Sequence, residues 1–493
     1  MFAGRTIELA DLRRRLDSAD AEVIVVTGHR RTGKSRLIAE ACEHRNVIAF
    51  QAADETARLN FQAFRRTCIQ ALGPAGLDTC NDWATLLDTL AARARTQPGL
   101  VVVLDNFNAL CEADETLPFV LRGFCRTALM EGGQLKLILS GSNVARMTDL
   151  TRGSPSQARH ALAGLRTRLF ELAPLTLREA AAFFPNYTDE ARIAAYAVFG
   201  GVPAYLAACD PDKSLAVNIV ELLLSPYGRL VDEPAHTLAH DLRDVKVYAS
   251  ILRAIANGCR ESGEIRSFIM GAQTGMSISP YLEKLSAMRL IAGARAFDAD
   301  PKARYMRFSI CDPLTRFWNL FVQPNRLVID QGGGAALFET TIKRQLGDYM
   351  VLGFEAICRD HAATYGDELF GARFEAVGQA WGDGYNLAIA GRLVGQRPLF
   401  GACAWQTRAV GDAGFAYLEQ QARLSGLWPE DGGALSPPAY VVFSRSGFEA
   451  EITERARLSP NLRLVTPADI LRPNPQGAYL RSSGPPASSL LAM

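Results

Sequence analysis

Eight consecutive residues, Gly28 to Ser35, combine the residue types that hold phosphate groups in proteins. They read Gly-His-Arg-Arg-Thr-Gly-Lys-Ser and fit the pattern G-x-x-x-x-G-K-[ST]. Glycines let such a loop curl, so that successive backbone N–H groups point at one anion. Lys34 supplies a positive charge to the phosphate oxygens, and the Ser35 hydroxyl is a ligand for Mg²⁺. This stretch therefore predicts a nucleoside triphosphate site.

The residues on either side favour the same interpretation. An apolar run at 23–26 predicts a strand before the loop, and the rhythm of residues 34–41 predicts a helix after it. The N-terminal end of that helix would present its dipole to the phosphates. The predicted nucleotide contacts on the loop are Gly28, His29, Arg30, Arg31, Thr32, Gly33, Lys34, Ser35 and Arg36.

A metal partner for Ser35 is expected at the end of another buried strand. Asp105 follows the apolar run LVVVL and would hold Mg²⁺ through water, opposite Ser35. Ser35 and Asp105 are thus the predicted metal site, and Lys34 and Asp105 the predicted catalytic residues. The next residue is Asn106, whose amide can position water but cannot accept its proton at neutral pH.

A third polar segment follows the apolar run at 135–139. A polar residue ending a strand beside that of Asp105 can read the γ-phosphate of ATP, and the candidates are Ser140, Ser142 and Asn143. The same residue types are common in strand-to-helix turns, so an ordinary turn is the alternative.

Apolar patterning indicates the organisation of the chain. Short continuous apolar runs, typical of strands buried on both faces, alternate with amphipathic segments and predict an α/β core with a parallel sheet. Beyond the core we expect a helical lid, then three helices and a β-hairpin suggesting a winged helix-turn-helix, then a small α/β domain. The segment 323–336 reads as a linker. The predicted divisions are 1–165 for the core, 166–238 for the lid, 239–326 for the winged helix, 327–472 for the last domain and 473–493 for a disordered tail.

Composition excludes several classes of protein. The net charge of +1 gives no overall field for nucleic acid or an anionic membrane. The ten cysteines contain no CxxC pair, which argues against a zinc site or disulfide framework and favours a reducing compartment. The N-terminus lacks an apolar signal segment, and the longest apolar runs are only strand-sized. We therefore expect a soluble, cytoplasmic protein with no membrane partner.

These motifs, in this order, resemble the archaeal-type ATPase family in the STAND branch of P-loop NTPases, which are relatives of AAA+ proteins. FAGRTIELADL is similar to the opening helix cap of that family, and YAVFGGVPAYLAACD to its lid. YASILRAIANG and PYLEKLSAMRLI resemble its winged helix, and SICDPLTRFWNLFVQPNR its exit segment. The likeness runs to about residue 326. It implies ATP and Mg²⁺ as cofactors.

The resemblance also assigns residues and exposes departures. Gly201 and Pro203 match the lid motif that packs against adenine. The family usually carries Glu at the position of Asn106, so slow hydrolysis is implied. Its Pro-Leu-Tyr-Gly-Arg stretch reads ALAGLRTR here, so Arg166 is not assigned as a γ-phosphate sensor.

The last domain resembles a degenerate restriction-endonuclease-like fold of the PD-(D/E)xK class. Glu355 matches the first carboxylate of that class, but it reads equally well as a solvated or capping residue. The Asp position falls in YNLAIAG, which has none, and the Glu and Lys positions are Ala402 and Ala404. The resemblance therefore implies a pseudo-nuclease without a metal site.

The winged helix allows DNA contact or an interdomain clamp that senses nucleotide. Its second helix carries Lys284 and Arg289 but also Glu283, whereas DNA-reading helices are usually richer in basic and amide residues. Near-zero net charge favours the clamp. The residues that could touch phosphates nearby are Arg295, Lys302, Arg304 and Arg307.

Together the motifs predict an ATP-binding STAND-type switch, with Mg²⁺-dependent ATP binding and slow or absent hydrolysis controlling domain closure or assembly. One alternative is an active ATPase that uses Glu112, Asp114 or Glu115 as its base. Another is an ATP-gated DNA-binding regulator working through the winged helix. The expected partners are ATP or ADP, DNA in the last case, and a protein partner or a second copy of the chain.

Overall fold

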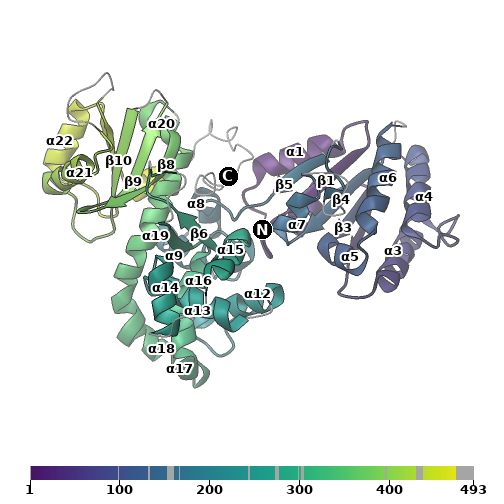
Figure 1. The fold of residues 1–493 in the computed structure, drawn as a ribbon, viewed down its shortest axis with the longest axis horizontal. Coiled ribbons are helices and arrows are strands. Elements are labelled where there is room, and N and C mark those ends of the chain that lie inside the picture. Colours follow the sequence, from purple (N-terminus) through teal and green to yellow (C-terminus); the bar gives the residue numbers. More distant parts are fainter. Residues whose placement is uncertain are drawn as a thin grey trace. The chain divides into compact units, whose positions relative to one another are not determined.

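The computed structural model divides the chain into two compact units (Figure 1). The N-terminal unit comprises Met1–Leu175 with Val202–Ala204, and the C-terminal unit comprises Thr176–Gly201 with Tyr205–Met493. The residues that the structure describes are 2–97, 99–130, 134–152, 160–165, 167–242, 245–271, 277–297, 299–300, 305–372, 374–394, 397–428 and 437–472. Arg166, Lys302, Arg304 and the predicted tail 473–493 lie outside them.

The N-terminal unit is built on a five-stranded, all-parallel sheet with the order β2-β3-β4-β1-β5. This confirms the predicted α/β core. Its strands are β1 (Glu22–Thr27), β2 (Val47–Gln51), β3 (Val101–Asp105), β4 (Lys136–Gly141) and β5 (Thr167–Glu171). Its helices are α1 (Thr6–Leu16), α2 (Lys34–Ala41), α3 (Ala57–Leu72), α4 (Trp83–Thr96), α5 (Phe107–Ala113), α6 (Leu117–Met130) and α7 (Val144–Asp149).

Four of these strands coincide with the apolar runs of the sequence, and β5 does not. The β5 sequence TRLFE has only two apolar residues, Leu169 and Phe170, between polar and charged ones, and β5 is an edge strand that pairs only with β1. A search for continuous apolar runs therefore passes over it. Its addition extends the compact N-terminal unit to Leu175.

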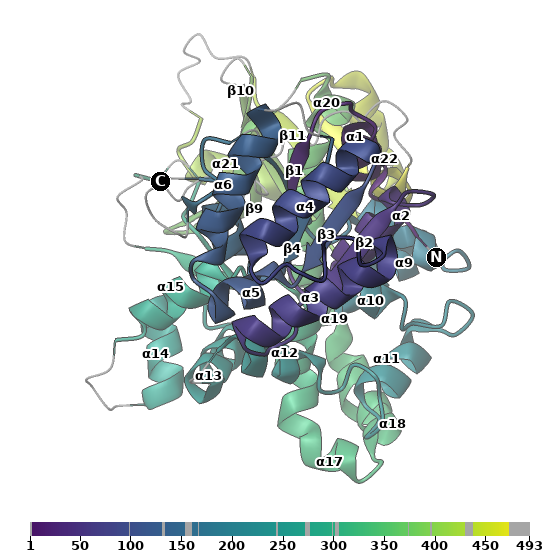
Figure 2. The ribbon, with the colours of Figure 1, turned by 90° about the vertical axis from the view of Figure 1, so that its right-hand side faces the viewer.

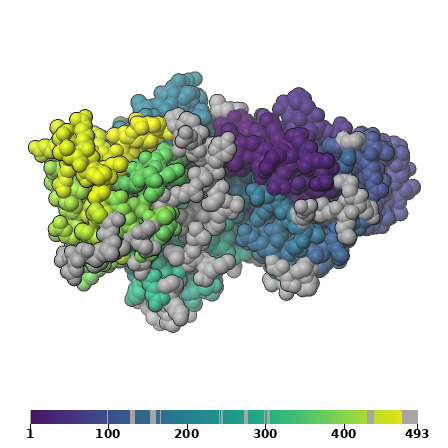
Figure 3. Space-filling model, turned by 90° about the horizontal axis from the view of Figure 1, so that it is seen from above, coloured from purple at the N-terminus to yellow at the C-terminus, as the bar shows by residue number. Residues whose placement is uncertain are grey.

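Alternating residues of β1, an inner strand of the sheet, contribute to two hydrophobic cores, one on each face of the sheet. Ile24 and Val26 pack with Leu12 of α1 and Leu37 of α2. Val23 and Val25 belong to the cluster that includes α3, α4, α5 and α6. Figure 2 shows α3, α4 and α6 in front of the sheet, and Figure 3 shows the first part of the chain, in purple, on an outer surface of its unit. Because both faces are covered, the ends of the strands carry the polar residues.

The C-terminal unit begins with short helices and continues into a helical trio and a hairpin. The helices are α8 (Leu177–Ala180), α9 (Asp189–Phe199), α10 (Pro203–Leu206, which starts in the N-terminal unit), α11 (Leu215–Leu223), α12 (Glu233–Asp241), α13 (Val245–Ala256), α14 (Ser262–Met270) and α15 (Ser279–Ala287). The hairpin strands, β6 (Ile291–Ala294) and β7 (Arg307–Ile310), pair antiparallel. This order of elements is the one that the sequence analysis predicts for a winged helix; the interpretation itself stays a prediction.

The segment 323–336 is folded, so the prediction of a linker there is wrong. It contains a short helical turn (Gln323–Asn325), α17 (Arg326–Asp330) and the start of α18 (Gly334–Leu337), and it follows α16 (Pro313–Phe317) and the helical turn Trp318–Val322. Arg326 donates a 3.2 Å hydrogen bond to Asp232, and Ile329 is fully buried. The three consecutive glycines suggested flexibility, but a Cβ on Gly334 would overlap the carbonyl of Leu224. Close packing therefore requires glycine at 334.

A second five-stranded sheet, the C-terminal sheet, ends the described chain, as predicted for the last domain. Its order is β12-β11-β10-β9-β8, antiparallel from β8 to β10 and parallel from β10 to β12. The strands are β8 (Phe374–Gly382), β9 (Tyr385–Leu393), β10 (Arg397–Ala404), β11 (Ala439–Ser444) and β12 (Leu462–Val465). The helices are α19 (Lys343–Thr364), α20 (Gly366–Phe370), α21 (Asp412–Leu424), α22 (Ala450–Leu458) and α23 (Pro467–Leu471).

Candidate nucleotide site

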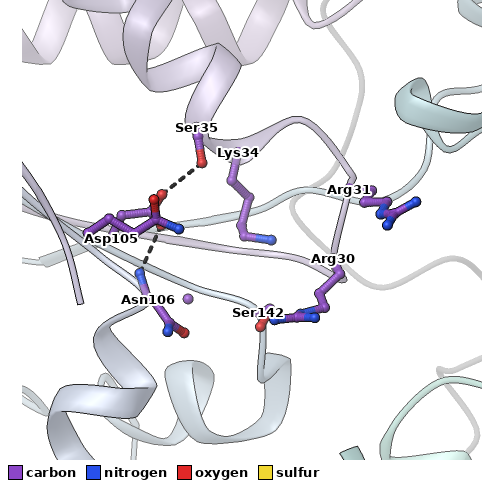
Figure 4. A pocket seen from close by; sticks show the side chains of 9 residues that line it. Arg30, Arg31, Lys34, Ser35, Asp105, Asn106 and Ser142 are labelled. Atoms are coloured by element: carbon purple, nitrogen blue, oxygen red, sulfur yellow. Dashed lines mark hydrogen bonds between the residues drawn. The ribbon is translucent and has the colours of Figure 1, made fainter. Parts of the chain in front are cut away.

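A cavity of about 260 Å³ lies in the N-terminal unit where β1, β3 and β4 end (Figure 4). Open parallel sheets bind ligands at the carboxyl ends of their strands, so the position is the expected one. The lining residues are Arg30, Arg31, Lys34, Ser35, Gln51, Asp105, Asn106, Gly141 and Ser142.

Glycines shape the loop between β1 and α2. Gly33 has a φ of 90° directly before α2, a backbone conformation that suits glycine. A Cβ on Gly28 would lie 2.5 Å from the carbonyl oxygen of Leu172, which no side chain tolerates. Thr32 fixes the tip of the loop, because its hydroxyl donates a 2.7 Å hydrogen bond to the carbonyl of His29.

Lys34 is buried inside this loop. Its Nζ donates 2.8 Å hydrogen bonds to the carbonyls of Gly28 and His29. Burial lowers the pKa of Lys34 to about 8; the Asp105 carboxylate partly opposes this, and the Arg30 charge adds to it. The loop carbonyls thus hold the ammonium group at a position from which a phosphate can recruit it.

Ser35 and Asp105 meet as the sequence analysis expects. The Ser35 hydroxyl donates a 2.8 Å hydrogen bond to Oδ2 of Asp105, while Oδ1 accepts a 2.9 Å bond from the backbone N–H of Asn106. A hydroxyl and a carboxylate are the hard oxygen ligands that Mg²⁺ prefers, and this ion keeps several waters in such sites. The donor set therefore fits Mg²⁺.

Asn106 is held by its backbone and by its amide. It adopts the left-handed conformation, with φ 56° and ψ 39°, which asparagine tolerates better than most residues. Its Nδ2 donates a 3.1 Å hydrogen bond to the carbonyl of Ala52, just beyond the end of β2. The side chain at this position is thus engaged with the backbone of a neighbouring segment.

Only one of the three candidates after β4 lines the cavity. Ser142 does, and Figure 4 shows it on the side of Arg30. Asn143 caps α7 by accepting a 3.1 Å bond from the backbone N–H of Arg146, as an ordinary turn residue does. Ser140 is fully buried in β4 and is not among the lining residues.

The carboxylates proposed as alternative bases do not line the cavity either. Glu112 forms a 3.2 Å ion pair with Arg146. Asp114 accepts a 2.9 Å bond from the backbone N–H of Thr116. Among the lining residues, Asp105 is the one carboxylate.

Two residues of the site were not predicted from the sequence to be functional. Gln51 ends β2 directly opposite Asp105 in the register, and its place at the end of a predicted strand was the available signal. Arg5 is 3% exposed; it donates to the carbonyls of Ala173 and Thr32, the latter at 3.4 Å, and forms a 3.3 Å ion pair with Glu8. The Gly-Arg-x-x-Glu motif could have indicated Arg5, but the sequence analysis interpreted that motif only as a helix cap.

The remaining residues predicted to contact the nucleotide lie in different places. Arg36 points into a 3.3 Å ion pair with Glu40 on α2 and does not line the cavity. Pro203 belongs to the N-terminal unit, and a Cβ on Gly33 would lie 3.7 Å from its Cγ. Gly201 belongs to the C-terminal unit and is buried after α9.

In the last domain, Glu355 and the two alanines lie on opposite faces of the sheet. Cys403 of β10 lies beside Cys358 of α19, the helix that carries Glu355. Ala402 and Ala404 alternate with Cys403 and pack against the cluster containing α21 and α22. Burial raises the pKa of Glu355, which Arg359 partly offsets. Across the described residues, no three His, Cys, Asp or Glu side chains gather as a metal-binding group.

The β6–β7 hairpin packs against the C-terminal sheet within the C-terminal unit. The backbone N–H of Phe297 donates a 2.6 Å hydrogen bond to the carbonyl of Gln379 in β8. The Arg307 guanidinium lies 4.5 Å from the ring centroid of Trp381 and also donates a 3.4 Å bond to Asn386. The Arg392 guanidinium lies 5.7 Å from the ring centroid of Phe297. The hairpin is therefore engaged inside its own unit.

No helix within the described parts of the chain combines the length and apolar character that crossing a bilayer requires.

Comparison with known proteins finds similarity that includes the N-terminal unit. Residues 2–209 match a family model described as an ATPase domain predominantly from Archaea, which is less than half of the chain. An uncharacterized protein of Methanocaldococcus jannaschii is 24% identical over 440 residues, covering 87% of this chain and 93% of its own. The N-terminal segment is thus similar to archaeal ATPase domains, and the second similarity continues well beyond that segment.

Solved structures give weaker likenesses. The Walker-type ATPase PABY2304 of Pyrococcus abyssi has a TM-score of 0.48 at 17% identity, covering 64% of this chain and 96% of its own. The Aeropyrum pernix ORC2 protein, solved in ADPNP–ADP complexes, has a TM-score of 0.42 at 16% identity, covering 66% and 94%. A STAND protein of Pyrococcus horikoshii has a TM-score of 0.30 at 13% identity, covering 75% and 51%. These scores are too low to bear on function.

Proposed function

We propose that this chain is a Mg²⁺-dependent ATP-binding switch that hydrolyses ATP slowly or not at all. The observation that carries the proposal is the arrangement at the end of β3. There Asp105 contacts Ser35, while Asn106 is bonded to the Ala52 carbonyl. The site thus has the groups that bind a metal–nucleotide complex, and its lining holds no carboxylate beyond Asp105 to accept a proton from water.

Within this proposal each residue has a separate role. The loop N–H groups and the start of α2 bind the phosphates, and Lys34 leaves the Gly28 and His29 carbonyls to reach them. Ser35 and Asp105 hold Mg²⁺, which neutralises phosphate charge when bound. Pro203, beside Gly33, offers a rigid apolar surface for the base.

The switch would act through the segment at which the chain passes from one unit to the other. Val202–Ala204 belongs to the N-terminal unit while the chain on either side belongs to the C-terminal unit. A nucleotide bound near Gly33 and Pro203 would therefore act on a segment of chain that is continuous with both units. We propose that this controls domain closure or assembly with a protein partner or a second copy of the chain.

Two measurements test the proposal directly. Purified protein should bind ATP in the presence of Mg²⁺, and Lys34→Ala should remove that binding without lowering the melting temperature by more than a few degrees. Rapid turnover by the wild-type protein that Lys34→Ala abolishes would contradict the slow-switch part. It would favour an active ATPase instead.

The DNA-regulator alternative has less support. Arg307, one of the basic residues expected to touch DNA phosphates, is engaged with Trp381 and Asn386. This favours the clamp interpretation of the helical trio and hairpin. A pseudo-nuclease interpretation of the last domain is likewise a proposal; Glu355 and the two alanines lie on opposite faces, so these three positions would not form one metal site.

A further inference from the structure

Arg30 is a cation at the nucleotide cavity that has no partner among the residues that the structure describes. Its side chain is exposed and lines the cavity, and it forms no hydrogen bond or ion pair with the residues that the structure describes. Two basic residues at the start of α2 differ, since Lys34 is bonded to two carbonyls and Arg36 is paired with Glu40. An unpaired guanidinium over a cavity is available to an anionic ligand.

The charges of the cavity favour such a ligand. Its lining contains the three basic residues Arg30, Arg31 and Lys34, against the single carboxylate Asp105. Arg30 lies close enough to Lys34 for its charge to help lower the pKa of that amine. An anion between the two cations would remove this repulsion and favour the charged form of Lys34.

The direction of the Arg30 side chain indicates which phosphate it would meet. Arg31 has a φ of 64°, and this left-handed residue turns the loop between the two arginines. In Figure 4 the Arg30 side chain runs towards Ser142, whereas that of Arg31 runs away from Lys34. Ser142, Asp105 and Asn106 line the end of the cavity formed by β3 and β4. Phosphates held by the loop and α2 would extend their terminal group towards that end.

We infer that Arg30 contacts the terminal phosphate of a bound nucleoside triphosphate and thereby distinguishes ATP from ADP. The inference rests on the proposed function, in that the nucleotide must occupy this cavity. A guanidinium donates two parallel hydrogen bonds to phosphate oxygens, a geometry that an ammonium group lacks. The contact is one of specificity, because an always-charged arginine can read charge but cannot deprotonate water.

The test compares Arg30→Ala, Arg30→Lys and a matched control, Arg66→Ala. Arg66 is an exposed residue of α3 away from the cavity, so its removal changes the net charge equally. Isothermal titration calorimetry with Mg²⁺ measures the Kd of ATP and of ADP for each protein. Arg30→Ala should raise the Kd of ATP about tenfold to a hundredfold, the range expected for a lost charge-assisted hydrogen bond. It should change the Kd of ADP less than about twofold. Arg30→Lys should be intermediate for ATP.

Each other outcome has a distinct meaning. If Arg30→Ala weakens the binding of ATP and ADP equally, or weakens the binding of neither, the inference is wrong while the proposed site stands. If the wild-type protein binds neither nucleotide, the proposed function is wrong and the inference with it. Thermal melting of each variant separates these results from misfolding; because Arg30 is exposed, we expect no change in melting temperature.

Discussion

The Ser35 hydroxyl and the Asp105 carboxylate lie 2.8 Å apart, although the strands that lead to them, β1 and β3, are not neighbours. Strand β4 lies between those strands. The contact therefore crosses the end of β4, where Gly141 and Ser142 line the cavity.

From this contact we expect Asp105→Asn to remove the Mg²⁺ dependence of ATP binding. Asparagine keeps an acceptor for Ser35 but loses the charge that attracts the ion. Wild-type protein should bind ATP about tenfold tighter with Mg²⁺ than with a chelator, and the variant should bind equally in both. Asp88→Asn, at an exposed position of α4, is the control and should keep the difference. A persistent Mg²⁺ effect in Asp105→Asn would place the ion elsewhere.

A carboxylate restored at position 106 should raise turnover. Asn106→Asp is preferred to Asn106→Glu, because Asn106 is left-handed and a longer side chain costs about 1 kcal/mol there. The aspartate cannot donate to the Ala52 carbonyl, so it is free to approach a water molecule. We expect phosphate release to rise about tenfold or more, within the usual range for a general base. Glu112→Gln should leave turnover unchanged; a loss there would instead identify Glu112 as the base.

ATP affinity should fall as pH rises above about 8, the pKa of Lys34 in the free protein. Bound phosphates raise that pKa, so binding above pH 8 takes up a proton. The affinity should decline by up to tenfold per pH unit until the pKa of the complex is reached. Calorimetry in two buffers of different ionisation enthalpy detects the proton. Binding without proton uptake at pH 9 would contradict the buried, depressed amine.

Arg5→Ala should destabilise the N-terminal unit and weaken ATP binding together. The buried guanidinium holds Thr32 of the phosphate loop and Ala173 beyond β5, and its loss leaves these carbonyls without that donor. We expect a loss of about 1–3 kcal/mol in the free energy of unfolding, measured by urea denaturation. Arg14→Ala, in helix α1 that Arg5 precedes, should cost less than about 0.5 kcal/mol, because Arg14 is exposed. Equal effects would show that Arg5 has no special role.

The hairpin should contribute little to DNA affinity. Arg307→Ala should leave duplex binding unchanged in fluorescence anisotropy at low and moderate salt, because its guanidinium already contacts Trp381. It should lower the melting temperature slightly through the lost cation–π contact, worth about 0.5–1 kcal/mol. Salt-dependent duplex binding that Arg307→Ala weakens would revive the DNA-regulator alternative.

Much of the site could be predicted from sequence, because its residues follow local rules. The loop motif lies between a buried strand and a helix, and Asp105 ends an apolar run, so their meeting follows from a parallel sheet. The last domain was predictable as an α/β domain, and its sheet and helices agree with that expectation.

The features that could not be predicted from the sequence depend on the three-dimensional surroundings of a residue. The contact of Asn106 with Ala52 joins positions 54 residues apart through a left-handed backbone. The opposite directions of Arg30 and Arg31 result from one positive φ angle. The glycines near 333 suggested a linker, yet Gly334 serves a close approach to Leu224. No local propensity encodes these relationships.

The position of β4 between β1 and β3 also limits how a ligand can act. Neighbouring strands lie about 4.8 Å apart, so the backbones of β1 and β3 are held roughly 10 Å apart by the hydrogen bonds of β4 on both sides. The sheet therefore works as a rigid frame of constant width. A ligand cannot spread or narrow it, and any signal must leave through the segments that depart from the strand ends.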